Sequence, residues 1–286
     1  MRVAAVGDNC VDVYYTLNRF YPTGNAVDFA INLKKLGQDV SLVSIQGDDV
    51  FGVSVENVLK KYGVDLTHFY KGGRQTAAAQ MNIINGDRIH EKFDKNVLAD
   101  FTLDRERLDF VKQFDLVYSE KWSRIGRYIK DIKNGNNIMI HDFSKRLADP
   151  GNEEILPYLD YAFFSYEKLD ETIKDFLKST QKKTGRIVIA MLGGDGSLAY
   201  DGSRYYREPA KQVEIVNTVG AGDAYVAGVL FGLLKYDSVP AAIDFGNAMS
   251  AVKNTIVGDM PASDFEEIHK VVAQHRGEGG SGEMDR

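Results

Sequence analysis

Residues 217–228 read Asn-Thr-Val-Gly-Ala-Gly-Asp-Ala-Tyr-Val-Ala-Gly, a glycine-rich turn that leads directly into an apolar helical pattern. Glycine lets a backbone approach a ligand closely. The first amides of a helix have no partner within the helix and lie at the positive end of its dipole. Gly220, Ala221 and Gly222 therefore suit an anion hole. Asp223 lies beside them, where its carboxylate could accept the proton of an attacking hydroxyl.

The same stretch has a simpler interpretation, in which Asp223 only caps a helix and the glycines only make a turn. A dinucleotide-binding fingerprint fits poorly, because Tyr225 stands where its third glycine belongs. A P-loop is absent, since the sequence contains no Gly-Lys-Ser or Gly-Lys-Thr. The residues alone therefore leave two interpretations, a site of phosphoryl transfer and a plain helix start.

Outward from this turn, short apolar runs alternate with amphipathic helical patterns. The expected strands are 3–6, 40–45, 116–118, 138–140, 161–164 and 187–192, and the expected helices are 25–36, 55–62, 222–234, 240–256 and 263–274. Ser263 and Glu266 form a capping box for the last of these helices. The alternation predicts an α/β fold with a mainly parallel central sheet and helices on both faces.

Two segments, 11–21 and 76–92, interrupt this rhythm with alternating polar and apolar residues, and Asn85-Gly86-Asp87 reads as a hairpin turn. We expect a small β-sheet lid built from about 11–23 and 72–97, which would exclude water from phosphoryl transfer. An antiparallel edge on the main sheet is the alternative. We expect a single domain over 1–276 and a disordered, glycine-rich tail over 277–286.

Composition excludes several classes of protein. The chain has 286 residues and a formal net charge of -6, which gives no support to nucleic-acid binding. It has one cysteine, Cys10, so no intrachain disulfide can form, which suits a reducing compartment. No run approaches the roughly 20 apolar residues of a membrane helix, and the first residues do not form a signal peptide. We therefore expect a cytoplasmic protein with no membrane partner.

The stretch 217–230 resembles the C-terminal signature of the ribokinase-like (PfkB) carbohydrate kinases, which usually reads Asp-Thr-x-Gly-Ala-Gly-Asp and then Ala-Gly after three residues. The resemblance extends to about Ala273. It implies an ATP-dependent sugar kinase that uses Mg²⁺. It also implies that Asp223 is the catalytic base and that the amides of Gly220, Ala221 and Gly222 form the anion hole.

The same resemblance implies a sugar site in the N-terminal half. A Gly-Asp pair and a further Asp follow the first strand, and a glycine and an amide open the first helix. The sugar-binding residues implied are Asp8, Asn9, Asp12, Gly24, Asn25 and Asp28. Thr23 and Asp28 stand where glycine and asparagine are commonest. An ordinary turn at the end of a strand is the alternative for Asp8, Asn9 and Asp12.

For ATP, the resemblance implies contacts from Gly193 and Gly196 after a strand and from Asn247 and Ala248 on a helix beside adenine. The magnesium motif Asn-x-x-Glu is altered, with Ser165 in place of its Asn and Lys168 in place of its Glu. No metal ligand is assigned. Three nearby carboxylates could substitute or simply face solvent: Glu167, Asp170 and Glu171. Asn217 replaces an Asp that helps organise a monovalent-cation site in several relatives, which leaves a potassium requirement open.

Stretches 7–12, 98–101 and 141–144 resemble the fructoselysine 6-kinase branch of this family. That implies transfer to the 6-hydroxyl of fructoselysine or a related fructosamine. Residues available to bind its charged groups are Tyr14, Glu91, Asp94, Glu120 and Trp122. The alternatives are a kinase for another acceptor, such as fructose, ribose, a keto-deoxy acid or a nucleoside, and a non-catalytic sugar sensor. Lid sheets of relatives sometimes pair, so a homodimer through the lid is a further expectation.

Overall fold

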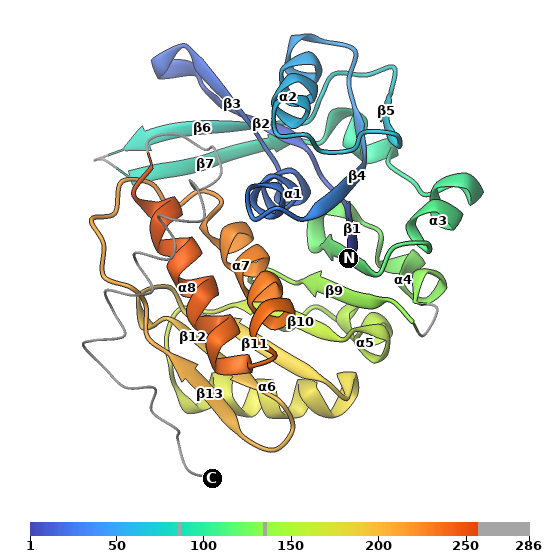
Figure 1. Cartoon of the computed structure of the whole chain (residues 1–286). Coiled ribbons are helices and arrows are strands. Elements are labelled where there is room, and N and C mark those ends of the chain that lie inside the picture. Colours follow the sequence, from blue (N-terminus) through green and yellow to red (C-terminus); the bar gives the residue numbers. More distant parts are fainter. Residues whose placement is uncertain (85–86, 134–135, 257–286) are drawn as a thin grey trace.

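The computed structural model describes residues 1–84, 87–133 and 136–256. A nine-stranded sheet runs through it in the order β13-β12-β11-β10-β9-β8-β1-β4-β5 (Figure 1). The strands are β1 (Arg2–Val6), β4 (Asp39–Gln46), β5 (Phe69–Lys71), β8 (Leu116–Glu120), β9 (Ile138–Asp142), β10 (Tyr161–Ser165), β11 (Ile187–Met191), β12 (Ser197–Tyr200) and β13 (Tyr205–Glu208). Neighbours from β5 to β11 pair in parallel, whereas β12 and β13 form an antiparallel edge.

Helices cover both faces of this sheet. One face packs against α1 (Asn25–Lys35), α2 (Val50–Lys61), α7 (Ala221–Tyr236) and α8 (Val239–Asn254). The other packs against α3 (Arg105–Val111), α4 (Gly126–Ile132), α5 (Asn152–Ile155) and α6 (Glu171–Thr184). Successive residues of a strand point to opposite faces. Accordingly, Val3 and Ala5 of β1 belong to the first core and Ala4 and Val6 to the second. The predicted α/β class is confirmed.

A second, four-stranded sheet is separate from the first. It has the order β3-β2-β6-β7 and consists of β2 (Cys10–Tyr14), β3 (Arg19–Thr23), β6 (Ala78–Ile84) and β7 (Asp87–Asp94). Its pairs are antiparallel except for β2 with β6. The predicted small sheet is confirmed, and the alternative of an edge on the main sheet is wrong. The turn at 85–86, the helix expected over 263–274 with Ser263 and Glu266, and the tail lie outside the described residues.

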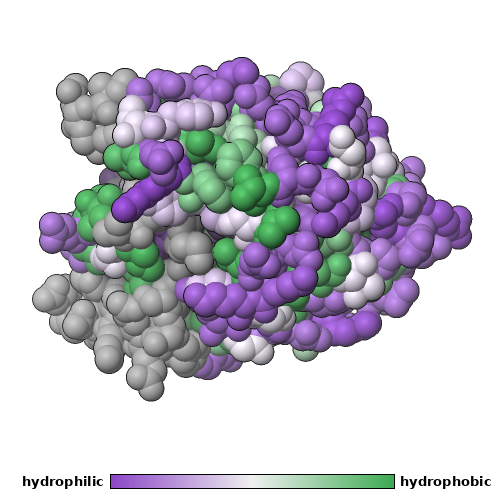
Figure 2. Space-filling model, turned by 90° about the horizontal axis from the view of Figure 1, so that it is seen from above, coloured by the Kyte–Doolittle hydropathy of each residue, from purple (hydrophilic) through white to green (hydrophobic). Residues whose placement is uncertain are grey.

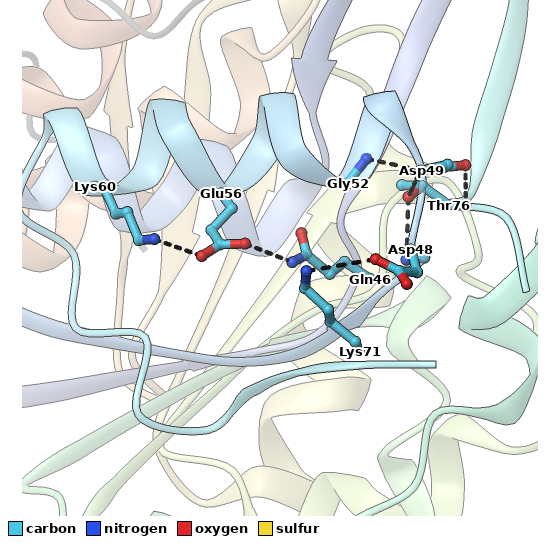
Figure 3. Close-up of polar contacts among 9 residues, drawn as sticks. Gln46, Asp48, Asp49, Gly52, Glu56, Lys60, Lys71 and Thr76 are labelled. Carbon is cyan, nitrogen blue, oxygen red and sulfur yellow. Dashed lines mark hydrogen bonds and ion pairs between the residues drawn. The ribbon is translucent and has the colours of Figure 1, made fainter. Parts of the chain in front are cut away.

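The chain passes from the main sheet to the small one after β1 and again after β5, and hydrogen bonds of Asp49 hold the second passage in place. Asp49 caps α2 by accepting a hydrogen bond from the Gly52 amide at 2.9 Å (Figure 3). The same carboxylate accepts from the amide of Thr76 at 2.9 Å and from its hydroxyl at 2.6 Å. Thr76 stands shortly before β6, so these bonds fix the entry to the small sheet. Over the described ranges, no helix has both the length and the apolar character needed to cross a membrane.

Candidate active site

Two cavities meet at the glycine turn. One, here called the acidic cavity, has a volume of about 410 Å³ and includes Gly220 and Asp223 in its lining. The other, the glycine-lined cavity, has a volume of about 540 Å³ and includes Ala221 and Gly222. The four residues that sequence places in the anion hole and at the base position are therefore divided between the two cavities. Groups bound on either side could react across this turn.

Gly220 has the backbone conformation that makes this turn. Its φ is 72°, in the left-handed region that favours glycine, and it caps the N-terminus of α7. A side-chain carbon at this position would lie 3.0 Å from Asp28 Oδ2 and 3.4 Å from Lys253 Cε. Upstream, the amides of Val216 and Asn217 donate to the carbonyl of Asn254 at 2.8 and 3.1 Å. The end of α8 therefore holds the chain that enters the turn.

Two helix N-termini converge on the acidic cavity. Asp8 follows β1 and its Oδ1 accepts from the Ala26 amide in the first turn of α1, at 3.3 Å. Gly24 caps α1 with a φ of 128°, and a side-chain carbon there would lie 2.7 Å from Asn9 Cα. The Asn25 side chain hydrogen-bonds to Asp223 in the first turn of α7. Partial positive charge at both helix starts therefore faces the carboxylates.

Asp223 is 8% exposed. Its Oδ1 has no hydrogen-bond partner among the described residues. Burial raises the pKa of Asp223 well above its ordinary value, and the charges of Asp28, Asp142 and Asp8 raise it further, against the hydrogen bond from Asn25. A buried carboxylate with an elevated pKa and a free lone pair suits a general base that works near neutral pH.

Further buried carboxylates surround this group. Burial raises the pKa of Asp8 to about 6 and that of Asp142 to about 6, although amides of Ala26, Asn25 and Ser144 oppose the shifts. Glu120 ends β8, and its two oxygens accept from the amides of Asp8 and Trp122. Burial and the Asp8 charge raise the pKa of Glu120 well above its ordinary value. The sequence analysis did not assign Asp142 to the site, although this residue lies in the stretch 141–144 that resembles the fructoselysine 6-kinase branch.

Most predicted sugar-site residues line the acidic cavity: Asp8, Asp12, Gly24, Asn25 and Asp28. Asn9 does not. It is fully buried, and its amide donates to Ser44 Oγ at 2.7 Å and to the Ile45 carbonyl at 2.5 Å, so it ties β4 to the chain after β1. The lining residues that sequence reasoning did not assign to the sugar site include Cys10, His90 and Phe93.

The residues considered for binding charged groups of the acceptor are dispersed. Trp122 lines the acidic cavity, whereas Tyr14 and Glu120 are buried. Glu91 accepts from Asn82, and Asp94 pairs with Lys92. Only Trp122 of this group is therefore placed to touch a ligand.

The glycine-lined cavity contains three of the four residues predicted for ATP: Gly193, Gly196 and Asn247. Gly193 and Gly196 lie in the connection between β11 and β12, both with positive φ. Ala248 does not line the cavity, because it points into the core between α8 and the sheet. Lys145 and Lys211 also line this cavity and were not predicted; Lys211 forms a buried ion pair with Asp244.

Of the candidate magnesium residues, Ser165 and Glu167 line the glycine-lined cavity. Asp170 instead caps α6 by accepting from the Ile173 amide at 3.0 Å. Lys168 pairs with Asp170, and Glu171 is exposed and pairs with Lys174. No group of three His, Cys, Asp or Glu side chains suited to a metal occurs within the part of the chain that the structure describes.

An acidic cavity, a glycine-lined cavity and a buried carboxylate at their shared turn define a class of enzyme. It transfers a group from a donor held by backbone amides to a hydroxyl held by carboxylates and amides.

The chain belongs to the pfkB family of carbohydrate kinases, whose model matches residues 16–264, and it is a sugar kinase. It is 32% identical to fructoselysine 6-kinase of Escherichia coli over 249 residues, 87% of this chain and 95% of that protein. It is 31% identical to a fructosamine kinase of Bacillus subtilis over 235 residues, 80% and 82% of the two chains. A ribokinase structure from Thermotoga maritima superposes with a TM-score of 0.81 at 20% identity, covering 96% of this chain and 99% of its own.

Proposed function

We propose that this sugar kinase transfers the γ-phosphoryl group of ATP to the 6-hydroxyl of fructoselysine or a closely related fructosamine. The observation that carries the transfer chemistry is the buried Asp223 Oδ1, which has no hydrogen-bond partner within the described part of the chain. It lies beside the Gly220–Gly222 turn between the two cavities. The choice of acceptor is supported by the identity to the two fructosamine-type kinases over most of this chain.

The charge of the acidic cavity also supports this acceptor. Its lining includes Asp8, Asp12, Asp28 and Asp223, and no Lys or Arg among the described residues. A fructosamine carries a secondary amine that is protonated at neutral pH. Such a cation is stabilised by nearby buried carboxylates. An anionic acceptor, such as a keto-deoxy acid, would be repelled by the same groups.

The proposed reaction is a single in-line transfer. The acceptor is oriented by Asp8, Asp12 and Asn25 in the acidic cavity. Its hydroxyl oxygen forms a bond to the γ-phosphorus while the bond from that phosphorus to the β–γ bridging oxygen breaks, and ADP leaves. Asp223 Oδ1 takes the hydroxyl proton. The amides of the turn stabilise the charge on the transferring group.

ATP and Mg²⁺ suit the other cavity. Gly193 and the α7 N-terminus offer backbone amides to phosphates, and Lys145 supplies a positive charge. Mg²⁺ binds through one or two carboxylates together with phosphate oxygens and water. Glu167 and Ser165 fit that donor set, and the ion would neutralise charge on the phosphates. A cytoplasmic location stays a prediction, and Asn217 leaves a potassium requirement open.

The small sheet is proposed to act as a lid and as a dimer surface. Tyr15, Leu17 and Ile89 are exposed on or beside it. Figure 2, which looks down on Figure 1, shows hydrophobic residues among hydrophilic ones on the face seen from above. A homodimer through the small sheet would bury Tyr15, Leu17 and Ile89. Light scattering at several protein concentrations tests this, and a monomer throughout would contradict it.

ADP release with Mg-ATP tests the proposed function, measured against fructoselysine, fructose, ribose and no sugar. We expect strong turnover with fructoselysine, and ¹³C and ³¹P spectra of the product that place phosphate on carbon 6. Turnover with ribose or fructose alone would discard the fructosamine acceptor and retain the kinase. Sugar binding without ADP release would favour a sensor.

A further inference from the structure

Lys253 is a charged residue that the proposed reaction does not use. It is the penultimate residue of α8 and is completely buried, with 0% of its surface exposed. Lysine is almost never fully buried unless its charge is compensated, because removing an ammonium group from water costs several kcal/mol. A non-polar residue would fill the same volume without that cost. The burial of Lys253 therefore points to a role for its charge.

The side chain of Lys253 ends against the glycine turn. Its Cε lies 3.4 Å from the point where a side-chain carbon of Gly220 would be, and Asp28 Oδ2 lies 3.0 Å from that same point. Asp28 is itself 2% exposed, and its Oδ2 accepts from the Thr23 hydroxyl at 2.9 Å. The ammonium group is one bond beyond Cε. Lys253 and Asp28 therefore bring opposite charges to one turn of the backbone.

We propose that Lys253 is a built-in cation of the active site, whose ammonium balances the charge of Asp28 and holds the Gly220–Gly222 turn in position for Asp223. This rests on the proposed transfer to a sugar hydroxyl. Lys253 lines neither cavity, so it would touch neither the acceptor nor ATP. It is a positioning residue that acts through Asp28 and the turn.

The charges around Asp223 show why such a cation matters. Asp28 faces it from α1, Asp142 from the end of β9, and Asp8 from the end of β1. Glu120 of β8 lies against Asp8. After burial, the charge of Asp28 is the largest cause of the raised Asp223 pKa.

A positive charge beside Asp28 opposes that effect. Removal of the Lys253 charge should raise the pKa of Asp223 further. Asp223 would then be protonated at a higher pH, so activity would be lost at a higher pH as the pH falls.

Two variants separate charge from packing. Lys253→Met keeps the length of the stem without charge, and Lys253→Arg keeps the charge. We would measure kcat/KM against pH with the acceptor that the wild-type enzyme uses. In Lys253→Met, the acidic limb of this pH profile is expected to move to higher pH by about one unit, with roughly tenfold lower kcat/KM at pH 7. In Lys253→Arg, the limb should stay in place. A Met variant with the wild-type limb and turnover, or equal losses in both variants with an unmoved limb, would overturn the proposal.

A melting-temperature cycle keeps the inference testable if Lys253→Met is poorly folded. Asp28→Asn combined with Lys253→Met leaves neither charge, so the double variant should melt higher than Lys253→Met alone. A double variant that melts no higher would overturn the proposal. Failure of the fructosamine assignment would appear in the wild-type sugar panel instead. The pH series would then use the sugar that is phosphorylated, and the melting cycle needs no acceptor.

Discussion

The acidic cavity and the glycine-lined cavity are built in different ways. The first is formed by side chains that other groups hold in place, such as Asp8 on the amides of α1 and Asp28 on the Thr23 hydroxyl. The second includes glycines at the connection through Gly193 and Gly196 and at the start of α7, beside side chains such as Lys145. On the proposed function, specificity for the acceptor lies in the acidic side chains, whereas the backbone at these glycines contributes to the binding of phosphates. The turn at 220–223 belongs to both.

The largest expected effect comes from the shared turn. Asp223→Asn keeps the size of the side chain and one acceptor oxygen but cannot take the hydroxyl proton. We expect kcat to fall by ~10²–10⁴, the usual scale for loss of a general base. Asp237→Asn, at the exposed far end of the same helix, is the matched control and should be near wild type. Near-normal turnover of Asp223→Asn would refute the assignment of the base.

Gly220→Ala should have the next largest effect, because it adds a carbon 3.0 Å from Asp28 Oδ2 at a φ of 72°. Gly185→Ala is a close control, since Gly185 has a φ of 69° with nothing within 4 Å of the added carbon. Both changes introduce backbone strain of about 1–3 kcal/mol. Only Gly220→Ala should also lower kcat/KM, by roughly 10–100-fold, because the added carbon crowds the turn that positions the reacting groups. Equal losses in the two variants would show that crowding at the turn is unimportant.

A change in the lining of the glycine-lined cavity should alter the KM for ATP and leave the KM for the sugar unchanged. Lys145→Met removes a positive charge from its lining, and we expect KM for ATP to rise by about 3–10-fold with little change in KM for the sugar. Lys183→Met is the control, because Lys183 pairs with Glu153 on the surface. A change in KM for the sugar of the same size would contradict the separation of the two cavities.

The smallest effect is on stability of the ligand-free enzyme. Burial raises the pKa of Asp142 from its ordinary 3.8 to about 6. The folded protein therefore binds this proton more tightly than the unfolded chain, and the stability due to it is lost as pH rises from about 4 through 6. Asp142→Asn removes that dependence and can still accept from Ser144. The difference in melting temperature, Asp142→Asn minus wild type, should be a few degrees larger at pH 7 than at pH 5. No change would contradict the shift.

The sequence predicts the main sheet well, because its inner strands are continuous apolar runs between glycine and polar residues. It does not predict β13, whose residues Tyr205–Glu208 are polar at an edge. The small sheet is predictable from alternation in 11–21 and 76–92, although alternation alone cannot separate it from an edge of the main sheet. Pairing decides that question, and pairing is a property of the folded chain.

The candidate site is predictable where a motif carries it. Asp223, Gly220 and the Asp8 turn have recognisable surroundings in the sequence. Asn9 adjoins Asp8, yet its amide turns to Ser44 and Ile45 instead of the cavity. Asp142 lies in the stretch 141–144 that resembles the fructoselysine 6-kinase branch, but that resemblance gives it no role, and no local pattern marks Lys253. Only the packing of distant elements shows that the charge of Asp142 acts on Asp223 and that Lys253 reaches the turn from α8.

On the proposed mechanism, the turn joins two separately formed cavities and Asp223 serves transfer rather than binding. Calorimetric titration of Asp223→Asn with Mg-ATP, and separately with the acceptor, measures binding apart from turnover. We expect dissociation constants within about threefold of wild type for both ligands, beside the large loss of turnover. Loss of ATP binding or of acceptor binding in that variant would contradict it.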